Sequence, residues 1–247
     1  MTQTQFKQIA TYYDDLMAGV PYNLWVRYIE NILKRIEHSP RTVLDLACGT
    51  GNVSELMAEK GYKVVGADIA PDMIEVARSK NSDVEYHVQD MAELDLDGRR
   101  FDLAISLFDS LNYILDPNRL AKAIERVGEH LVEGGIFIFD VNTEYALAHH
   151  FFDQANIASN HYPHYVWNSE YDNSTRICTV NMTFRVVEDG ENVEFKEVHL
   201  QRAHSLEELT MMLTDAGFDV VDIFHAYKFR RPTRRSDRVF YVARKVI

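Results

Sequence analysis

Three aspartates that follow short apolar runs could bind a polar, positively charged ligand. Asp45 lies in TVLDL, Asp68 ends KVVGAD, and Asp90 ends VEYHVQD. The segment ACGTG comes directly after the first run, and its glycines, Gly49 and Gly51, let backbone approach a ligand without interference from a Cβ atom. A carboxylate at such a place accepts hydrogen bonds from a ribose diol and attracts a cation. The pattern predicts a site for a cationic nucleoside.

The elements that must position these residues alternate between strands and helices. Apolar runs rich in strand formers are followed by segments with apolar residues at helical spacing. Such alternation is typical of a parallel, doubly wound α/β sheet, which binds ligands at the carboxyl ends of its strands. We expect strands at 42–46, 63–70, 84–90, 101–114 and 136–142, and helices that include one from Pro71 to Lys80 and one that begins at Asp116-Pro117 and ends before Gly134-Gly135.

The two ends of the chain and a segment near residue 180 depart from this alternation. Helical spacing runs from Pro21 to about Glu37, after a shorter possible helix from Phe6 to Met17. Between Tyr165 and Gln201 the residues alternate as in strands, with a turn at Glu188-Asp189-Gly190. Ser205 and Glu208 then form a capping box, and strands at 220–227 and 238–246 should pair antiparallel. We expect a mostly parallel sheet with an antiparallel last strand, plus an inserted antiparallel β-sheet. The predicted parts are an N-terminal helical cap (1–40), the α/β domain (41–145 and 202–247) and the insertion (146–201).

Composition limits the possible partners. The formal net charge of −12 disfavours binding to nucleic acid, because such binding depends on lysine and arginine. The only two cysteines, Cys48 and Cys178, lack the spacing of a metal site. No apolar stretch approaches the ~20 residues of a membrane span, and the N-terminus has no targeting pattern. We therefore expect a cytoplasmic protein without a metal and without a membrane partner; the oligomeric state stays open.

A dinucleotide-binding oxidoreductase is the main competing interpretation. Gly49-x-Gly51-x-x-Ser54 approximates GxGxxG, and Asp68 follows at a suitable distance. However, a pyrophosphate needs free N–H groups at a helix N-terminus, and Asp45 and Asp90 would place negative charge beside it. S-adenosylmethionine has no phosphate and carries a sulfonium and an ammonium group, so the charge pattern favours that ligand over NAD.

The motifs DLACGTGN, GADIAPDMIEVAR, VQDMAEL and DSLNYI together resemble those of class I S-adenosylmethionine-dependent methyltransferases. The similarity extends over nearly the whole chain, towards small bacterial methyltransferases and amino-sugar N-methyltransferases. It implies a Rossmann-like cofactor-binding domain, a small-molecule acceptor on the side of the insertion, which would act as a lid, and S-adenosylhomocysteine as product. It also implies cofactor-binding residues for the methionine part (Asp45, Ala47, Gly49, Gly51, Leu107), the ribose and adenine (Asp68, Ile69, Met73), the adenine edge (Asp90, Met91) and closure of the site (Tyr13, Tyr22, Trp25).

Two residues are candidates for removing a proton from the acceptor. His199 lies on a predicted strand of the insertion, on the same face as Glu197 and Gln201, and can titrate near neutral pH. Asp109 follows the fourth strand and could orient an amine or a hydroxyl. Both residues also have structural interpretations, as a solvated strand histidine and a turn cap. The expected reaction is direct methyl transfer to nitrogen or oxygen, while cofactor binding without catalysis and NAD chemistry remain alternatives. The segment Ser106-Leu107-Phe108-Asp109 replaces the NPPY pattern of methyltransferases that act on amino groups of nucleic acids, which disfavours adenine and glutamine amides as acceptors.

Five arginines near the C-terminus surround Pro232. They could bind the phosphate of an acceptor such as a nucleotide sugar, or they could lie in a solvated loop between the last two strands. The five are Arg230, Arg231, Arg234, Arg235 and Arg238.

Overall fold

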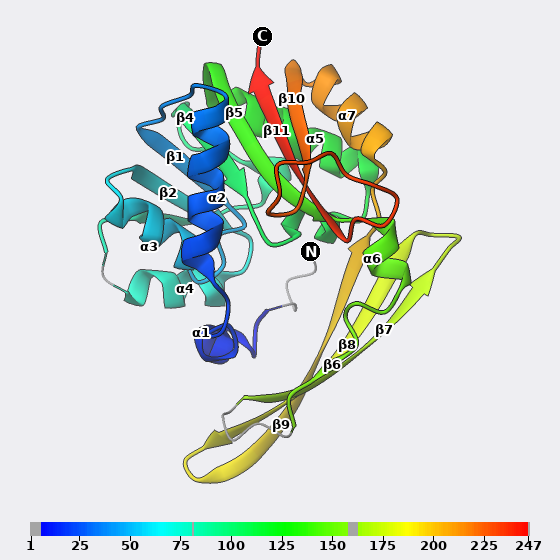
Figure 1. The fold of residues 1–247 in the computed structure, drawn as a ribbon. Helices are drawn as coiled ribbons and strands as arrows, with labels where there is room; N and C mark the ends of the chain where they lie inside the picture. The colour runs from blue at the N-terminus through cyan, green and yellow to red at the C-terminus, as the bar shows by residue number, and fades with distance from the viewer. Residues whose placement is uncertain (1–5, 81, 158–162, 247) are drawn as a thin grey trace.

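Two β-sheets and their helices form the structure, a computed structural model that describes residues 6–80, 82–157 and 163–246 (Figure 1). The larger sheet has seven strands in the order β10-β11-β5-β4-β1-β2-β3. β11 runs antiparallel to both of its neighbours, β10 and β5, and the other described pairings in this sheet are parallel. This confirms the predicted mostly parallel sheet and the antiparallel pairing of the last two strands. The strands are β1 (Thr42–Leu46), β2 (Lys63–Asp68), β3 (Glu85–Val88), β4 (Phe101–Ser106), β5 (Leu131–Asn142), β10 (Phe218–His225) and β11 (Arg238–Lys245).

Helices cover both faces of this sheet because its strands are apolar on both sides. Successive residues of β1 show the alternation: Val43 packs in the cluster formed with α2, α3 and α4, whereas Leu44 packs with α5 and α7. Predicted caps fix the helix starts. The Asp116 side chain accepts from the N–H of Asn118 at 2.9 Å, and Ser205 and Glu208 form a capping box. The helices are α2 (Tyr22–Arg35), α3 (Asn52–Glu59), α4 (Pro71–Ser79), α5 (Pro117–Glu129) and α7 (Leu206–Asp215).

The inserted sheet is antiparallel, in the order β6-β7-β8-β9, and extends away from the larger sheet (Figure 1). It follows α6 (Glu144–Ala148) and returns directly to α7. Its longest hairpin turns at Asp189-Gly190, where both residues have positive φ, as the sequence predicts for a tight hairpin. A third apolar cluster joins the inner face of this sheet to the N-terminal segment, residues 6–20. The strands are β6 (Gln154–Ala155), β7 (His164–Asp172), β8 (Ile177–Glu188) and β9 (Glu191–Arg202).

The predicted helix from Phe6 to Met17 is wrong in length. The structure has a 3₁₀ turn, η1 (Ala10–Tyr12), followed by one short helix, α1 (Tyr13–Leu16). The backbone N–H groups of Phe6 and Ile9 donate instead to the Glu197 side chain, at 3.1 and 3.2 Å. Hydrogen bonds to a distant carboxylate therefore hold this segment, and the local sequence pattern does not reveal them.

The largest differences between predicted and observed strand boundaries concern β4 and β5. The strand expected over 101–114 ends at Ser106, because Phe108 and Asp109 both have positive φ and the chain then forms the 3₁₀ turn η3 (Ser110–Tyr113). The strand expected from residue 136 begins at Leu131, ahead of the glycine pair. A third 3₁₀ turn, η2 (Met91–Glu93), follows β3. Among the described residues, no helix is both long and apolar enough to cross a membrane.

Candidate active site

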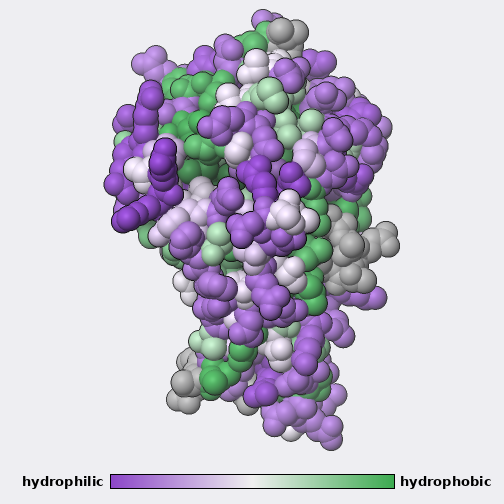
Figure 2. Space-filling view, turned by 90° about the vertical axis from the view of Figure 1, so that its right-hand side faces the viewer, coloured by the Kyte–Doolittle hydropathy of each residue, from purple (hydrophilic) through white to green (hydrophobic). Residues whose placement is uncertain are grey.

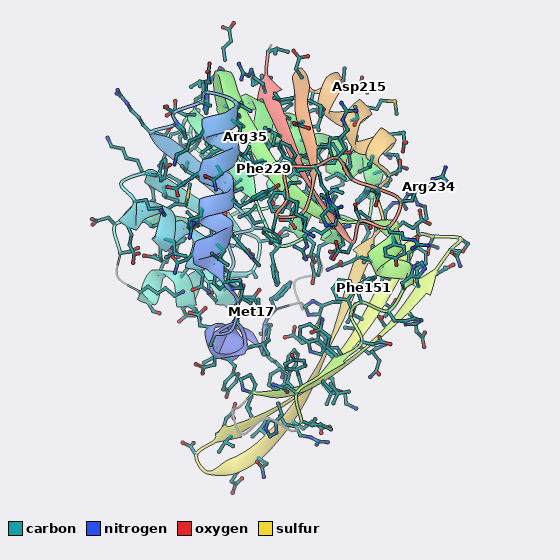
Figure 3. The ribbon with its side chains drawn as sticks, viewed as in Figure 1. Met17, Arg35, Phe151, Asp215, Phe229 and Arg234 are labelled. Atoms are coloured by element: carbon teal, nitrogen blue, oxygen red, sulfur yellow. The ribbon has the colours of Figure 1, made fainter. Side chains whose placement is uncertain are left out.

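A cavity of about 430 Å³ lies between the carboxyl ends of the parallel strands, the N-terminal segment and the inserted sheet. Met17, labelled beside α1 in Figure 3, is part of its wall. The outer surface is largely hydrophilic, with apolar residues in a hollow of the upper body and dispersed over the narrower insertion (Figure 2). Polar and aromatic residues from three separate parts of the chain line this one cavity. The predicted site residues that line it are Tyr13, Tyr22, Trp25, Asp45, Ala47, Gly49, Asp68, Met73, Leu107, Asp109 and His199.

The glycine turn after β1 uses its two glycines differently. Gly49 has φ +55°, a Cβ built on it would meet nothing within 4 Å, and its N–H donates to Asp68 at 2.9 Å. Gly51 has φ +80° and begins α3 as its N-cap, and a Cβ there would lie 2.2 Å from the hydroxyl of Tyr86. Gly49 thus leaves open space beside the cavity, whereas Gly51 does not line this cavity and permits close packing against Tyr86.

Two buried carboxylates, Asp45 and Asp68, lie at this end of the cavity. Burial and, to a smaller extent, the charge of Asp68 raise the pKa of Asp45 to about 7, against the lowering effect of the Ser54 hydroxyl, which donates to it at 2.5 Å. Asp68 accepts from the backbone N–H groups of Gly49 and Ala70, and burial raises its pKa as well. Each oxygen of a carboxylate can accept more than one hydrogen bond, so Asp68 retains acceptor capacity for a ligand. A ligand cation would favour ionisation of both groups.

Asp90 lies in a smaller cavity of about 30 Å³ together with Ile69 and Met91. Ala47 and Asp68 line both cavities, so the two are neighbours. Asp90 forms an ion pair with Arg119 of α5 and accepts from the N–H of Ala92 at 2.9 Å. The structure thus gives Asp90 a capping role and places it beside the other strand-end carboxylates.

Three aromatic residues predicted to close the site belong to the N-terminal part of the chain and face the cavity. Trp25 contacts Phe108, which follows β4, with ring centroids 5.3 Å apart, and Tyr22 at 5.2 Å. Tyr13 contacts Phe6 at 6.2 Å. Met73 also belongs to the apolar cluster under the inserted sheet. Packing therefore accounts for part of the role of each residue.

Asp109 is held in a buried ionic network. Arg238 donates to Asp109 at 2.5 Å and also pairs with Asp140 of β5, and Gln201 donates to Asp109 at 2.6 Å. Burial raises the pKa of Asp109 to about 6, against the lowering effect of Arg238. Asp140 accepts from the N–H groups of Phe108 and Asp109, at 2.7 and 3.1 Å, and so stabilises their left-handed backbone. The network fixes the shape of the turn after β4.

His199 is only 1% exposed, so the half-exposed strand position expected from sequence is wrong. Its Nε2 lies 2.8 Å from Glu197, and its Nδ1 lies 3.0 Å from the hydroxyl of Tyr113. The predicted shared face of Glu197, His199 and Gln201 is confirmed, since all three are buried, while Val198 between them is 52% exposed. Strand β9 therefore turns its polar side inward, towards the cavity.

The arginine cluster separates into two parts. Arg238 belongs to the buried network, whereas the other four arginines are exposed on the loop between β10 and β11. Figure 3 shows that this loop reaches from Phe229, beside Arg35 of α2, to Arg234 at its far side; the Arg35 guanidinium lies 4.7 Å from the centre of the Phe229 ring. None of the four exposed arginines lines either cavity.

Comparison with known proteins decides the family. The sequence model described as "Methyltransferase domain" matches residues 43–135. A protein of Geobacillus sp. (strain WCH70) that is named as a methyltransferase is 30% identical over 246 residues, which cover 97% of this chain and 99% of that protein. The crystal structure of an S-adenosylmethionine-dependent methyltransferase from Clostridium acetobutylicum ATCC 824 is 28% identical, covers 98% of this chain and 99% of that one, and superposes with a TM-score of 0.85. The chain belongs to the class I S-adenosylmethionine-dependent methyltransferases. This membership favours methyl transfer over nicotinamide chemistry and over binding without catalysis.

A second similarity covers less than half of the chain. A dTDP-3-amino-3,6-dideoxy-alpha-D-glucopyranose N,N-dimethyltransferase of Streptomyces fradiae is 33% identical to this chain over 105 residues, which are 42% of this chain and 41% of that protein.

The residues present fit S-adenosylmethionine, because buried carboxylates lie beside the open backbone at Gly49 and could pair with its cations.

The sequence analysis did not identify two residues of the site. Tyr113 was not a candidate there, and Arg238 was named only as one of five clustered arginines. Two features of the sequence could have indicated these residues. Asp140 interrupts the apolar run IFIFDV, and the segment that forms β9 has polar residues at alternate positions on both sides of Val198. A buried charge in a central strand needs a partner, and here the partner is Arg238.

Proposed function

We propose that this methyltransferase transfers a methyl group from S-adenosylmethionine to nitrogen or oxygen of a small-molecule acceptor bound in the main cavity. The observation that carries this proposal is the continuity of the cavity from the glycine turn to the inner face of the inserted sheet. In this proposal the N-terminal cap (1–40) and the insertion (146–201) enclose the Rossmann-like domain (41–145 and 202–247). The insertion acts as the acceptor-side lid.

The strand-end residues would hold the cofactor, which supplies a methyl group activated by its bond to a sulfonium. Asp45 would attract the ammonium of the methionine part, and Asp68 would accept hydrogen bonds from the ribose. Asp90, Ile69 and Met91 would surround the adenine. Well-oriented reactions gain roughly 7–11 kcal/mol from positioning, so alignment and exclusion of water by the cavity walls are the main expected contributions of the protein.

The far end of the cavity would hold the acceptor. Its walls are mostly aromatic or apolar, and its polar groups include Asp109, Tyr113, His199 and Gln201. Carboxylates outnumber the single arginine among the lining residues, which favours an acceptor that carries an amine over one whose reacting end is anionic. The similarity to a sugar N,N-dimethyltransferase supports the same class. The walls contributed by the insertion are Phe152, Gln154, Tyr165, Trp167, Met182, Phe184, His199 and Gln201.

An acceptor screen tests this function. The purified protein is incubated with S-adenosylmethionine and with small amines, amino sugars, phenols and alcohols, and formation of S-adenosylhomocysteine is measured. We expect acceptor-dependent turnover that an Asp68→Ala variant largely loses. Turnover on a protein or nucleic-acid acceptor, with none on small molecules, would contradict the proposal.

A further inference from the structure

We propose that Tyr113, His199 and Glu197 form a proton relay at the acceptor end of the cavity, in which the Tyr113 hydroxyl takes the proton that the acceptor loses. This inference rests on the proposed function and adds the group that receives the proton. It also distinguishes between the two candidate residues, His199 and Asp109.

The three side chains form a continuous hydrogen-bonded chain. The Tyr113 hydroxyl lies 3.0 Å from His199 Nδ1, and His199 Nε2 lies 2.8 Å from Glu197 Oε2. Tyr113 and His199 both line the cavity, whereas Glu197 lies behind them. All three are less than one-tenth exposed. Tyr113 therefore faces the acceptor space, with the other two groups arranged in line behind it.

The network assigns the position of each proton. Glu197 accepts from the backbone N–H groups of Phe6 and Ile9, so its oxygens act as acceptors and His199 Nε2 is the donor. When His199 is neutral, its Nδ1 carries no proton and therefore accepts a hydrogen bond from the Tyr113 hydroxyl. Burial raises the pKa of Tyr113 well above its usual value, so the hydroxyl keeps its proton and donates it. The Gln201 amide is also hydrogen-bonded to the Tyr113 oxygen, which leaves one lone pair for a donor in the cavity.

Asp109 is less suited to this task because its oxygens already have strong partners. Arg238 donates to Oδ1 and Gln201 to Oδ2. Protonation of Asp109 would disturb an ion pair that also holds Asp140. We therefore assign Asp109 the role of positioning Gln201 and the turn after β4.

Other ionisable groups also surround the relay. Asp109, Glu197 and Arg238 act electrostatically on Tyr113, and Tyr113 acts on the hydroxyl of Tyr13 from the N-terminal segment. Phe6 covers the His199 ring edge-on, with centroids 4.6 Å apart, so the same segment that bonds to Glu197 also shields the imidazole. The relay is complete only with this segment in place.

The proton transfer balances without a further reactant. As the acceptor nitrogen or oxygen forms its bond to the methyl carbon, the bond from carbon to sulfur breaks and its electron pair stays on sulfur. The acceptor's N–H or O–H proton passes to the oxygen of Tyr113, and the Tyr113 proton passes to Nδ1 of His199. The resulting imidazolium is paired with Glu197, and it releases the proton to solvent after the products leave.

Sinefungin tests the relay without a known acceptor. In this analogue an amine-bearing carbon replaces the sulfur, so the amine occupies the position of the transferable methyl group and faces the acceptor site. The measurement is the ratio of sinefungin to S-adenosylhomocysteine affinity, by calorimetry near pH 8. The ratio cancels groups that contact only the shared parts of the two ligands. The variants are Tyr113→Phe and His199→Gln, and Tyr241→Phe is the matched control, because it removes a buried hydroxyl bonded to Leu206 outside the cavity.

The relay predicts that Tyr113→Phe lowers the ratio about tenfold near pH 8, because a hydrogen bond to the ammonium is lost, and leaves S-adenosylhomocysteine affinity within about twofold. His199→Gln should lower the ratio as well and leave S-adenosylhomocysteine affinity nearly unchanged, because Tyr113 loses the Nδ1 acceptor that orients its hydroxyl. A merely structural histidine would change the two affinities together. An unchanged ratio in Tyr113→Phe or in His199→Gln would overturn the relay. Failure of the wild-type protein to bind S-adenosylhomocysteine would instead contradict the proposed function.

Discussion

The Asp14 carboxylate accepts a hydrogen bond from the Thr50 hydroxyl at 2.6 Å, which joins the N-terminal segment to the glycine turn. Asn52 donates to the same oxygen of Asp14 at 2.9 Å, and Lys80 forms an ion pair with the other. Near its start, the same segment is bonded to Glu197 of the inserted sheet. It therefore connects the expected cofactor end of the cavity to the expected acceptor end, and its release would open both.

Asp14→Ala should speed release of the cofactor product. The substitution removes the hydrogen bonds that the charged Asp14 side chain accepts. Because Asp14 is partly exposed, these bonds contribute less than buried ones would. We expect the dissociation rate of S-adenosylhomocysteine to rise roughly three- to tenfold. Stopped-flow fluorescence of Trp25, which lies in the cavity wall, measures this rate. The neighbouring exposed Asp15→Ala is the matched control and should leave the rate unchanged. Equal rates in both variants and the wild type would show that the segment does not retain the ligand.

Binding of S-adenosylhomocysteine should depend on pH through Asp45. Burial raises the pKa of this carboxyl to about 7 in the ligand-free protein, so it is increasingly protonated as pH falls below that value. A ligand ammonium binds the ionised form, so affinity should be highest above about pH 7 and fall by up to roughly tenfold for each pH unit below it. Binding near pH 6.5 should release a proton, which calorimetry in buffers of different ionisation enthalpy detects.

The Asp45→Asn variant is the control for this pH dependence. It keeps a similar shape and an oxygen that can accept from Ser54, but it cannot ionise. Its affinity should be low and nearly constant across the same pH range. A variant that retains the wild-type pH profile would assign the profile to another group.

Arg238→Met should destabilise the fold, because it leaves Asp109 and Asp140 buried without their counter-charge. Breaking such a pair costs about 3–5 kcal/mol, or roughly 10 °C in Tm for a chain of this size. Burial already raises the pKa of Asp109 to about 6, so its ionisation opposes folding as pH rises through that value. Without Arg238, the ionisation of Asp109 destabilises the folded state more strongly. Thermal unfolding should therefore show a larger deficit near pH 8 than near pH 5, and a deficit independent of pH would contradict this assignment.

The exposed arginines of the loop between β10 and β11 should be dispensable for cofactor binding. Replacing all four with alanine, while keeping Arg238, should change the affinity for S-adenosylhomocysteine by less than about twofold, because none of them lines either cavity. A large loss of affinity would show that the loop contributes to the cofactor site. The substituted residues are Arg230, Arg231, Arg234 and Arg235.

The main sheet was predictable from sequence because short stretches of neighbouring residues specify its strands and the starts of its helices. Apolar runs such as TVLDL, proline at Pro71 and Pro117, and the Ser205 capping box each act within a few residues, and they mark the strands and the helix starts. The position of the glycine turn and of the strand-end aspartates follows from the same pattern. These features also carry the family resemblance.

The acceptor end could not be predicted in the same way, because long-range contacts determine it. Asp109 meets Arg238 across 129 residues, and Tyr113 meets His199 across 86. The left-handed backbone at Phe108 and Asp109 depends on the Asp140 side chain from another strand. A strand propensity for 101–114 was therefore outweighed by a turn that only the tertiary structure stabilises.

Calorimetric titration with S-adenosylhomocysteine and, separately, with NAD tests the central claim most directly. We predict saturable binding of S-adenosylhomocysteine, weakened at least tenfold in Asp68→Ala, and no binding of NAD. Asp72→Ala, on the first turn of α4 and outside both cavities, is the matched control and should bind as the wild-type protein does. Preferential binding of NAD, or binding of S-adenosylhomocysteine that is insensitive to Asp68, would contradict the assignment of this site.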